Sequence, residues 1–425
     1  MVKLRRVLGL WELTVLGLGT IVGAGIYVLI GAAAGIAGNI VWLSFVIAAL
    51  ISYLRGFSYS ELASIFPKAG AEYTYITQSF GDLLGFLTGW MIIFGGLFSI
   101  ATVALGFGGY FVALFGGDQI LISLLLIVVL SAINFYGIKE SAITGIAATL
   151  VEVFGLLLII WIGLPYIGNV DYFEMPNGID GVIGAAALVF FAFLGYGGIV
   201  RLSEETRNPR ENIPKAIFIS ITLAMILYAL IAIVAVSVVD WRELGSSSAP
   251  LAEVAEKAFG KNASKILTII ALFATANTVL FSLISVSRII YGMGSEYSLP
   301  KELGKIHPTR RTPWVAIVVT MLFSIAFMSI GKIETVANIT NLSVFITFFL
   351  VNLAVIRLRY KPGIKRTFKI PLNIGKFPIF PAIASLICIV MIASFDLTVI
   401  SAGVILILSG LLAYKFLKGH RLGIL

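Results

Sequence analysis

The sequence has little charge and few of the residues from which metal or redox sites are built. Only 12% of its 425 residues are charged, about half of the roughly 25% that is typical of soluble domains. Cys388 is the single cysteine, so one chain can form neither a disulfide nor a multi-thiolate metal site. Both histidines, His307 and His420, stand in basic loop or tail sequence, which excludes a buried histidine proton relay.

Motifs of enzymatic chemistry are also lacking. There is no phosphate-binding loop, no cluster of metal ligands and no nucleophile–histidine pair within the apolar segments. An enzyme is therefore disfavoured, and neither a cofactor nor a metal is expected. A channel is disfavoured too, because no ring of charged or carbonyl-rich pore loops is evident.

Long apolar runs make up most of the chain, of which 59% is hydrophobic. The runs are long enough for membrane-spanning helices rather than barrel strands. They lie at roughly 12–36, 40–63, 83–113, 119–137, 142–166, 181–202, 213–238, 264–292, 314–330, 335–357, 378–395 and 397–417. We therefore predict an all-α polytopic protein of the lipid bilayer, with 12 transmembrane helices.

The distribution of basic residues predicts the orientation. If both termini are cytoplasmic, all but five of the 30 lysines and arginines fall on the cytoplasmic side, as the positive-inside rule requires. The exceptions are Arg242, Lys257, Lys261, Lys265 and Lys332. The net charge of +9 is thus explained by topology, and nucleic acid is not expected as a partner. We predict a multi-pass protein of the cell membrane with cytoplasmic termini.

Glycines interrupt the first apolar segment at membrane depth. It reads Leu16-Gly-Leu-Gly-Thr-Ile-Val-Gly-Ala-Gly-Ile-Tyr27, and each glycine weakens a helix by roughly 1 kcal/mol relative to alanine. A helix opened here would leave backbone N–H and C=O groups free for a ligand, as in many secondary transporters. The distance from Leu13 to Ala24 is about 16 Å of helix, which places the break near the bilayer midplane.

The sixth segment has a similar character near Gly195, about 18 Å of helix beyond Ile183. Five segments separate the two starts, so the two segments run in opposite directions. This predicts a five-plus-five inverted repeat, with repeats at about 12–166 and 181–357 and additional helices at about 378–417. Close packing of small residues is the alternative explanation for either glycine set alone. The matching depths favour a binding site.

Three stretches in order resemble the amino acid–polyamine–organocation (APC) transporter superfamily. They are Gly19-Thr-Ile-Val-Gly-Ala-Gly-Ile-Tyr27, Tyr59-Ser-Glu-Leu-Ala-Ser-Ile-Phe-Pro-Lys-Ala-Gly-Ala-Glu-Tyr-Thr-Tyr75, and Phe190-Phe-Ala-Phe-Leu-Gly-Tyr196 followed by Glu204-Glu-Thr-Arg-Asn-Pro-Arg-Glu-Asn-Ile-Pro214. The chain looks most similar to the cationic amino acid transporter branch and its prokaryotic, proton-coupled relatives. The resemblance implies the leucine-transporter-type fold, with discontinuous helices 1 and 6.

The resemblance also implies a substrate site. The substrate carboxylate would meet N–H groups at Gly23, Ala24 and Gly25. The ammonium group of the substrate would meet backbone carbonyls, namely those of Ile21, Phe191, Ala192 and Leu194. Helix dipoles agree with this assignment, because a helix N-terminus favours an anion and a C-terminus favours a cation. Phe191 would also act as a gate over the site, with ordinary packing as the alternative.

Glu152 is the one acidic residue that the segment boundaries place well inside the membrane, about 15 Å deep. Depth on the eighth segment makes Asn277 or Thr275 its expected neighbour. In the resemblance, sodium-coupled relatives hold an ion where segments one, five and eight meet, and several proton-coupled relatives place a lysine there. We predict that Glu152 carries the coupling proton. Sodium coordination and a permanently protonated structural role are the alternatives.

The sequence thus predicts a secondary active transporter that takes up amino acids by alternating access, coupled to protons rather than to sodium. An exchanger of amino acids or polyamines and a non-transporting sensor are the alternatives. The stretch Glu204–Pro214 either closes the cytoplasmic gate through ion pairs or forms a solvated loop. Arg55 is expected at the membrane boundary, with an inward-facing position as the alternative. The substrate side chain cannot be read from backbone groups.

Overall fold

A computed structural model gives the fold of the chain. It describes residues 3–247, 250–260, 262–328, 333–393, 395 and 397–421. Within its helices, a few side chains lie outside this description, namely those of Ala24, Val28, Ala113, Phe191, 262–264, 333–339 and 419–421.

The first half of the chain consists of helices joined by loops. Its α-helices are α1 (Leu10–Ile21), α2 (Ala24–Ala37), α3 (Val41–Ile65), α4 (Ala71–Phe80), α5 (Asp82–Phe115), α6 (Gln119–Tyr136), α7 (Ile138–Gly163), α8 (Gly178–Val189) and α9 (Gly197–Arg201). Short 3-10 helices connect several of them, namely η1 (Gly38–Ile40), η2 (Leu164–Tyr166), η3 (Phe190–Tyr196) and η4 (Ser203–Glu205).

The second half adds one small β-hairpin to a further set of helices. The helices are α10 (Pro209–Val238), α11 (Trp241–Ser246), α12 (Pro250–Phe259), α13 (Asn262–Ser295), η5 (Lys301–Gly304), α14 (Trp314–Phe327), α15 (Ile333–Tyr360), α16 (Ile379–Ala393) and α17 (Leu397–Arg421). The hairpin pairs β1 (Asn373–Ile374) with β2 (Phe377–Pro378), antiparallel, between α15 and α16.

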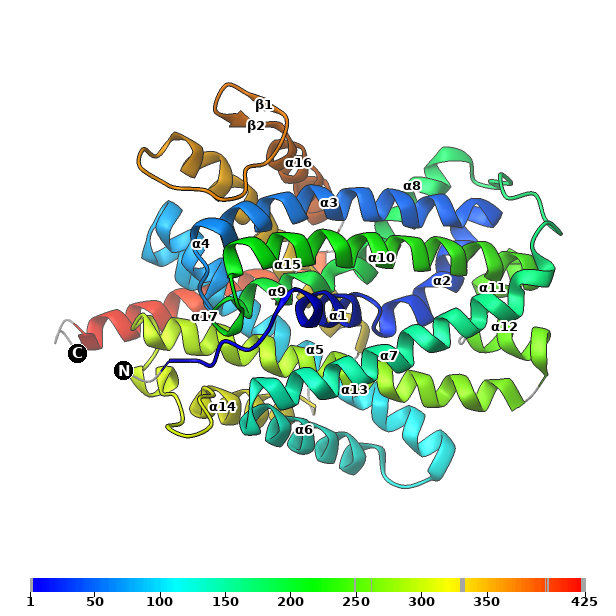
Figure 1. Cartoon of the computed structure of the whole chain (residues 1–425), viewed down its shortest axis with the longest axis horizontal. Helices are drawn as coiled ribbons and strands as arrows, with labels where there is room; N and C mark the ends of the chain where they lie inside the picture. Colours follow the sequence, from blue (N-terminus) through cyan, green and yellow to red (C-terminus); the bar gives the residue numbers. More distant parts are fainter. Residues whose placement is uncertain are drawn as a thin grey trace.

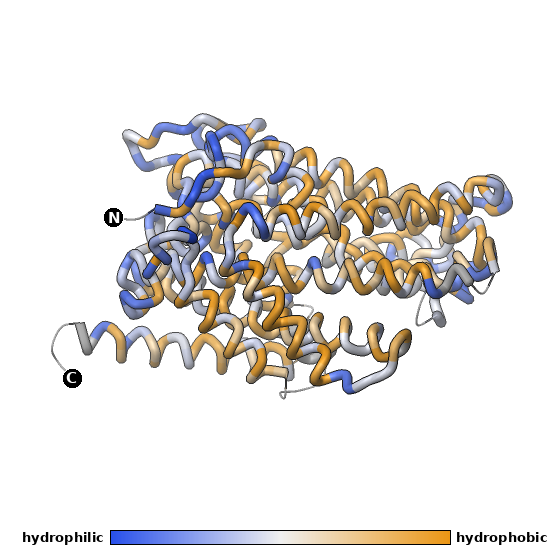
Figure 2. Tube along the Cα trace, turned by 60° about the horizontal axis from the view of Figure 1, so that its bottom comes forward, coloured by the Kyte–Doolittle hydropathy of each residue, from blue (hydrophilic) through white to orange (hydrophobic). Residues whose placement is uncertain are grey.

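The long helices are apolar along most of their length and run roughly side by side (Figures 1 and 2). In the part of the chain that the structure describes, ten helices are long and apolar enough to cross a membrane. Two shorter apolar helices, α14 and α16, are found besides these. The prediction of an all-α polytopic membrane protein is therefore confirmed, whereas twelve crossings stay a prediction.

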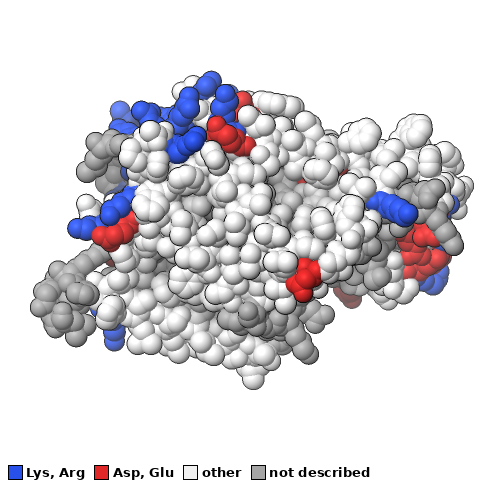
Figure 3. Space-filling view, turned by 90° about the horizontal axis from the view of Figure 1, so that it is seen from below, with Lys and Arg blue, Asp and Glu red and all other residues white. Residues whose placement is uncertain are grey.

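Surface charge gathers toward the two ends of the bundle. Hydrophilic stretches lie at the ends of the helices in Figure 2, and Figure 3 shows a wide band free of Lys, Arg, Asp and Glu on the face it presents. Lysines and arginines gather at the end that carries both termini (Figures 1 and 3). Such a band is what a hydrocarbon layer requires, because charged side chains in it are costly.

The interrupted helices lie inside the bundle. α1 packs on α10 and α7, and α10 packs along α3. α13 packs against both α5 and α7 on the other side. The buried side chains form one continuous hydrophobic core that includes Leu13, Ile26, Phe193 and Tyr228. This packing holds the ends of α1 and α8 in the interior, where their backbone groups can meet a ligand.

Candidate functional site

The first helix ends and restarts within three residues. Val22 donates its N–H to Leu18 O at 2.8 Å, and this is the last hydrogen bond of α1. Gly23, at φ −59° and ψ −158°, then starts α2 at Ala24. The Tyr228 hydroxyl donates to Ile21 O at 2.7 Å and so fixes the carbonyl at the end of α1. A helix C-terminus and a helix N-terminus therefore face one interior region.

The sixth segment departs from the expected shape. Instead of one break at Gly195, the α-helix ends at Val189 and the chain tightens into the seven-residue 3-10 helix η3 before α9. A 3-10 helix has fewer residues per turn and poorer hydrogen-bond geometry than an α-helix. The backbone carbonyls of Phe191, Ala192 and Leu194 all lie in this tightened stretch.

Glycine lets the two interrupted segments touch. A Cβ at Gly25 would lie 3.1 Å from Ala192 Cβ, and a Cβ at Gly195 would lie 2.9 Å from Ile21 N and run into the carbonyl of Thr20. Of the predicted site residues, the structure thus brings Ile21, Gly25 and Ala192 into one region. Ala24 starts α2 and Phe191 belongs to η3, but the side chains of both lie outside the described ones. The prediction that the Phe191 side chain acts as a gate therefore stays a prediction.

Replacing Gly195 by alanine is expected to reduce substrate affinity by about tenfold to a hundredfold. The added methyl group meets the backbone of Thr20 and Ile21, which cannot move aside as a flexible side chain can. Overpacking of this kind costs about 1–3 kcal/mol. It destabilises the conformation in which α1 and η3 are in contact. Binding of radiolabelled amino acid to the purified protein measures the change.

The matched control is Gly106→Ala, on α5 and outside the described cavity wall. A Cβ at Gly106 has none of the described neighbouring atoms within 4 Å, so this variant should bind like the parent protein. Equal affinity in both variants would contradict the close approach of α1 and η3.

A cavity of about 270 Å³ opens beside the contact between the two segments. Its volume is near the lower end of the roughly 300–1,000 Å³ of small-molecule sites. Part of its wall is polar, with Thr20, Ser99, Thr278, Ser282, Ser285 and Asn341. The apolar part includes Met91, Ile92, Val103, Leu194, Phe281, Val286, Val344 and Phe348. Ile21, Gly23, Gly25 and Ala192 also line it, so most of the predicted binding residues face one space.

One ion pair lies in the cavity wall. The Arg201 guanidinium donates to both carboxylate oxygens of Glu72, at 2.8 and 3.1 Å, and also to the Ser285 hydroxyl. No other charged residue lines the cavity within the described part of the chain. Because the two charges neutralise each other, the cavity offers no unpaired charge to a substrate side chain.

Glu152 is fully buried on α7, next to α13. Asn277 Nδ2 donates to Glu152 Oε1 at 2.9 Å and to Thr149 Oγ1 at 3.0 Å. Thr275 instead donates to the carbonyls of Ala271 and Leu272 in its own helix. The structure therefore pairs Glu152 with Asn277 and leaves Thr275 outside this contact.

The Glu152 group adjoins the interrupted first helix. A Cβ at Gly19 would lie 2.9 Å from Asn277 Nδ2 and collide with Thr149, so glycine makes room for the amide. Glu152 Oε2 and Asn277 Oδ1 are buried and have no hydrogen-bond partner among the residues that the structure describes. Two unpartnered acceptors in one interior site are satisfied by a proton or by a small cation.

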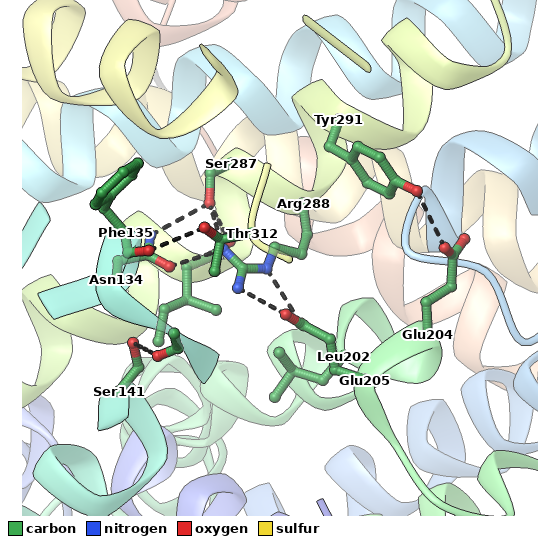
Figure 4. A network of polar contacts seen from close by, with 12 residues as sticks. Asn134, Phe135, Ser141, Leu202, Glu204, Glu205, Ser287, Arg288, Tyr291 and Thr312 are labelled. Atoms are coloured by element: carbon green, nitrogen blue, oxygen red, sulfur yellow. Dashed lines mark hydrogen bonds and ion pairs between the residues drawn. The ribbon is translucent and has the colours of Figure 1, made fainter. Parts of the chain in front are cut away.

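A second buried ion pair lies toward the end that carries the termini (Figure 4). Arg288 donates to both carboxylate oxygens of Glu205, at 2.8 and 3.1 Å, and both side chains are fully buried. Arg288 also donates to Asn134 Oδ1 at 2.7 Å and to Ser287 Oγ at 3.0 Å. Close by, the Tyr291 hydroxyl donates to Glu204 at 3.3 Å.

The N-terminal segment lies over this ion pair. Val7 and Leu8 donate their N–H groups to the backbone carbonyl of Glu205, at 3.0 and 3.1 Å, and Arg207 N donates to Leu8 O at 2.8 Å. Glu204 accepts a further bond from the N–H of Ala69 at 3.2 Å. The stretch that begins at Glu204 is therefore bonded to the N-terminal segment, to the loop before α4 and to α13.

Comparison with known proteins identifies the family. A family model described as amino acid permease matches residues 8–413. The chain belongs to the amino acid permease family. It is 31% identical to the branched-chain amino acid permease BcaP of Bacillus subtilis (strain 168), over 97% of this chain and 93% of that protein. This finding confirms the resemblance to the APC superfamily.

Other relatives of this amino acid permease differ in what their names say they carry. The methylthioribose transporter of Bacillus subtilis (strain 168) is 30% identical, over 91% of this chain and 88% of that protein. Cationic amino acid transporter 4 of Mus musculus is 29% identical, over 84% of this chain and 60% of that protein. The permease is accordingly a membrane transporter and not an enzyme.

Arg55 is a buried cation of the permease. It is only 2% exposed, which favours the inward-facing position that the sequence left as an alternative. Within the described part of the chain, its three guanidinium nitrogens have no hydrogen-bond partner, and the group lies over the rings of Phe348 and Tyr196. Aromatic faces attract a guanidinium by cation–π interaction. The sequence did contain a signal for such a contact. Arg55 is followed four residues later by the aromatic residue Tyr59, which is the spacing of neighbours on one face of a helix.

Proposed function

We propose that this permease takes up amino acids with apolar, uncharged side chains, the branched-chain ones above all, by secondary active transport. One observation carries the proposal: the cavity beside the two interrupted helices has a largely apolar wall, in which Glu72 and Arg201 neutralise each other. The name of its relative in Bacillus subtilis, branched-chain amino acid permease BcaP, agrees with this choice.

The main chain recognises the part that all amino acids share. The N–H groups of Gly23, Ala24 and Gly25 hold the substrate carboxylate, since the start of a helix carries about +0.5 charge. The carbonyls of Ile21 and of η3 hold the ammonium, and these include Phe191, Ala192 and Leu194. A zwitterion is thereby bound without any charged side chain, and the apolar wall then selects among side chains.

Alternating access follows from an inverted repeat. Two five-helix repeats, at about 12–166 and 181–357, form a leucine-transporter-type fold of twelve crossings, with further helices at about 378–417. Support comes from α1 and α8, each interrupted in the interior. The basic residues at the end with both termini support a cell-membrane protein with cytoplasmic termini.

Uptake is coupled to protons through Glu152. Its unpartnered Oε2 and the unpartnered Oδ1 of Asn277 support a site that alternately holds and releases a proton. The room that Gly19 leaves beside Asn277 supports a link to the first helix, which also carries substrate contacts. Sodium at the same two oxygens is the competing occupant, and ion replacement separates the two.

Counterflow in proteoliposomes tests the substrate. Vesicles preloaded with unlabelled leucine, isoleucine or valine should accumulate the corresponding radiolabelled amino acid. Vesicles preloaded with arginine, lysine, glutamate or methylthioribose should accumulate little, because the cavity provides no unpaired charge and the sugar lacks the zwitterion. Saturable counterflow of arginine or methylthioribose, with none of leucine, would refute the proposal. Binding of leucine without any counterflow would favour a sensor.

A further inference from the structure

The loop between α15 and α16 is basic throughout. Residues 361–378 contain five cationic side chains and no acidic one, and the cations are Lys361, Lys365, Arg366, Lys369 and Lys376. All four lysines are exposed, whereas Arg366 is partly buried against Glu61. The loop therefore presents an unbalanced positive charge at its surface.

The tip of this loop is an apolar hairpin. β1 and β2 pair Ile374 with Phe377 around a turn at Gly375 and Lys376. Exposure reaches 73% for Ile374 and 60% for Leu372. Leu372 also has a φ of +55°, a left-handed conformation that leucine rarely adopts. The fold therefore exposes two aliphatic side chains, although contact between apolar surface and water is unfavourable.

The base of the hairpin is fixed to the helix bundle. Glu61 on α3 accepts from Arg359 at 2.6 Å, from Arg366 at 3.1 Å and from Ile370 N at 3.0 Å. Ile379 N donates to Leu372 O at 3.2 Å, where α16 begins. The hairpin is therefore a rigid projection whose tip alone has no partner in the described part of the chain.

The projection lies beside the lipid-facing surface. It stands out laterally next to α16, at the end of the bundle that carries both termini (Figure 1). α16 itself exposes Leu386 at 63% and Val390 at 61%, as expected of a helix that faces hydrocarbon. The hairpin directly precedes α16. Its apolar tip, with lysines around it, has the composition of an interfacial anchor.

We propose that the 371–378 hairpin docks on the membrane in which the permease is embedded. Leu372 and Ile374 enter the headgroup region, and Lys369 and Lys376 bind the headgroups of anionic lipids. Charge complementarity favours anionic lipids, because no carboxylate of the loop competes for these lysines. The inference uses the membrane setting of the family and is independent of the substrate and of proton coupling.

Lipid-based quenching of a fluorophore at position 374 tests the docking. Cys388 is buried and the only cysteine, so Cys388→Ala gives a background for labelling. Ile374→Cys carries an environment-sensitive dye, and the full chain is reconstituted in vesicles of phosphatidylcholine alone or with phosphatidylglycerol. Spin-labelled lipids should quench the dye more strongly in the anionic vesicles. Replacing Lys369 and Lys376 by glutamine should weaken docking by about fivefold for each lysine.

The control dye is placed at Glu302→Cys, an exposed position in another basic loop at the same end. It should show weak quenching in both kinds of vesicle. Because a dye can itself prefer lipid, unlabelled protein in detergent provides a second readout. Added phosphatidylglycerol should raise its melting temperature more than phosphatidylcholine does, and the lysine double variant should lose the difference. Equal quenching at positions 374 and 302, or equal stabilisation by both lipids, would overturn the proposal while leaving transport untouched.

Discussion

Replacing Glu152 by glutamine is expected to abolish amino acid accumulation driven by a pH gradient and to preserve exchange. Glutamine has nearly the same shape and can still accept the bond from Asn277, which measures 2.9 Å in the parent protein. It cannot bind and release a proton, so the cycle loses its coupling ion. The interrupted helices and the cavity do not depend on this charge, and counterflow should therefore continue.

The size of the effect follows from the energy of the gradient. One pH unit corresponds to about 1.4 kcal/mol per proton, or roughly tenfold accumulation for one coupled proton. Vesicles with the parent protein and an inwardly directed gradient of about one unit should approach this ratio of internal to external amino acid. Vesicles with Glu152→Gln should stay near equality, and counterflow should persist in the same preparation.

Glu140→Gln is the matched control, because Glu140 lies on the same helix and is exposed. This variant should accumulate amino acid like the parent protein. Undiminished pH-driven accumulation by Glu152→Gln would refute proton coupling through Glu152. If accumulation by the parent protein instead required sodium and collapsed in choline, Glu152 and Asn277 would be ligands of sodium.

Features encoded locally could be predicted from the sequence. Hydropathy alone locates the long apolar helices, because a hydrocarbon layer demands continuous apolar runs. The glycines from Gly17 to Gly25 likewise indicate an interrupted helix, and α1 ends at Ile21. Depth along two helices was enough to propose Asn277 or Thr275 as the neighbour of Glu152, and Asn277 is the one that donates to it.

Features that depend on distant contacts could not be predicted. The 3-10 helix η3 has no sequence signature of its own, and the close approach of its Gly195 to the backbone of Thr20 is a contact between residues far apart in the sequence. The β-hairpin before α16 is too short to show a period. From the sequence, Glu204 and Glu205 could belong either to a solvated loop or to a gate closed by ion pairs. In the structure, Glu205 is fully buried. Its burial becomes visible only when Arg288, eighty-three residues later, is placed beside it.

Replacing Glu205 by glutamine is expected to destabilise the protein by about 3–5 kcal/mol, because Arg288 then keeps an uncompensated charge in the interior. Arg288 and Glu205 are both fully buried. The hydrogen bonds from Arg288 to Asn134 and Ser287 remain, but neither partner carries a negative charge. The free energy of unfolding in mixed detergent micelles measures the loss.

The control is Glu243→Gln, which removes the carboxylate from an exposed pair with Lys257. The hydrogen bond from Lys257 lowers the pKa of the Glu243 carboxyl, yet the pair is open to water, and exposed pairs contribute little. Glu243→Gln should therefore leave the free energy of unfolding unchanged within error. A similar small effect of Glu205→Gln would show that Asn134 and Ser287 suffice for Arg288.

A double replacement separates stability from gating. Changing Glu205 and Arg288 to methionine together removes both buried charges, and apolar replacement of a whole pair is often neutral or stabilising. The double variant should thus regain most of the stability that Glu205→Gln loses. The backbone bonds of Glu205 to Val7 and Leu8 do not involve its side chain, so the N-terminal segment should stay in place. If the variant is stable and binds substrate but transports slowly, the pair serves the opening and closing of this end. Unchanged transport would assign the pair to folding alone.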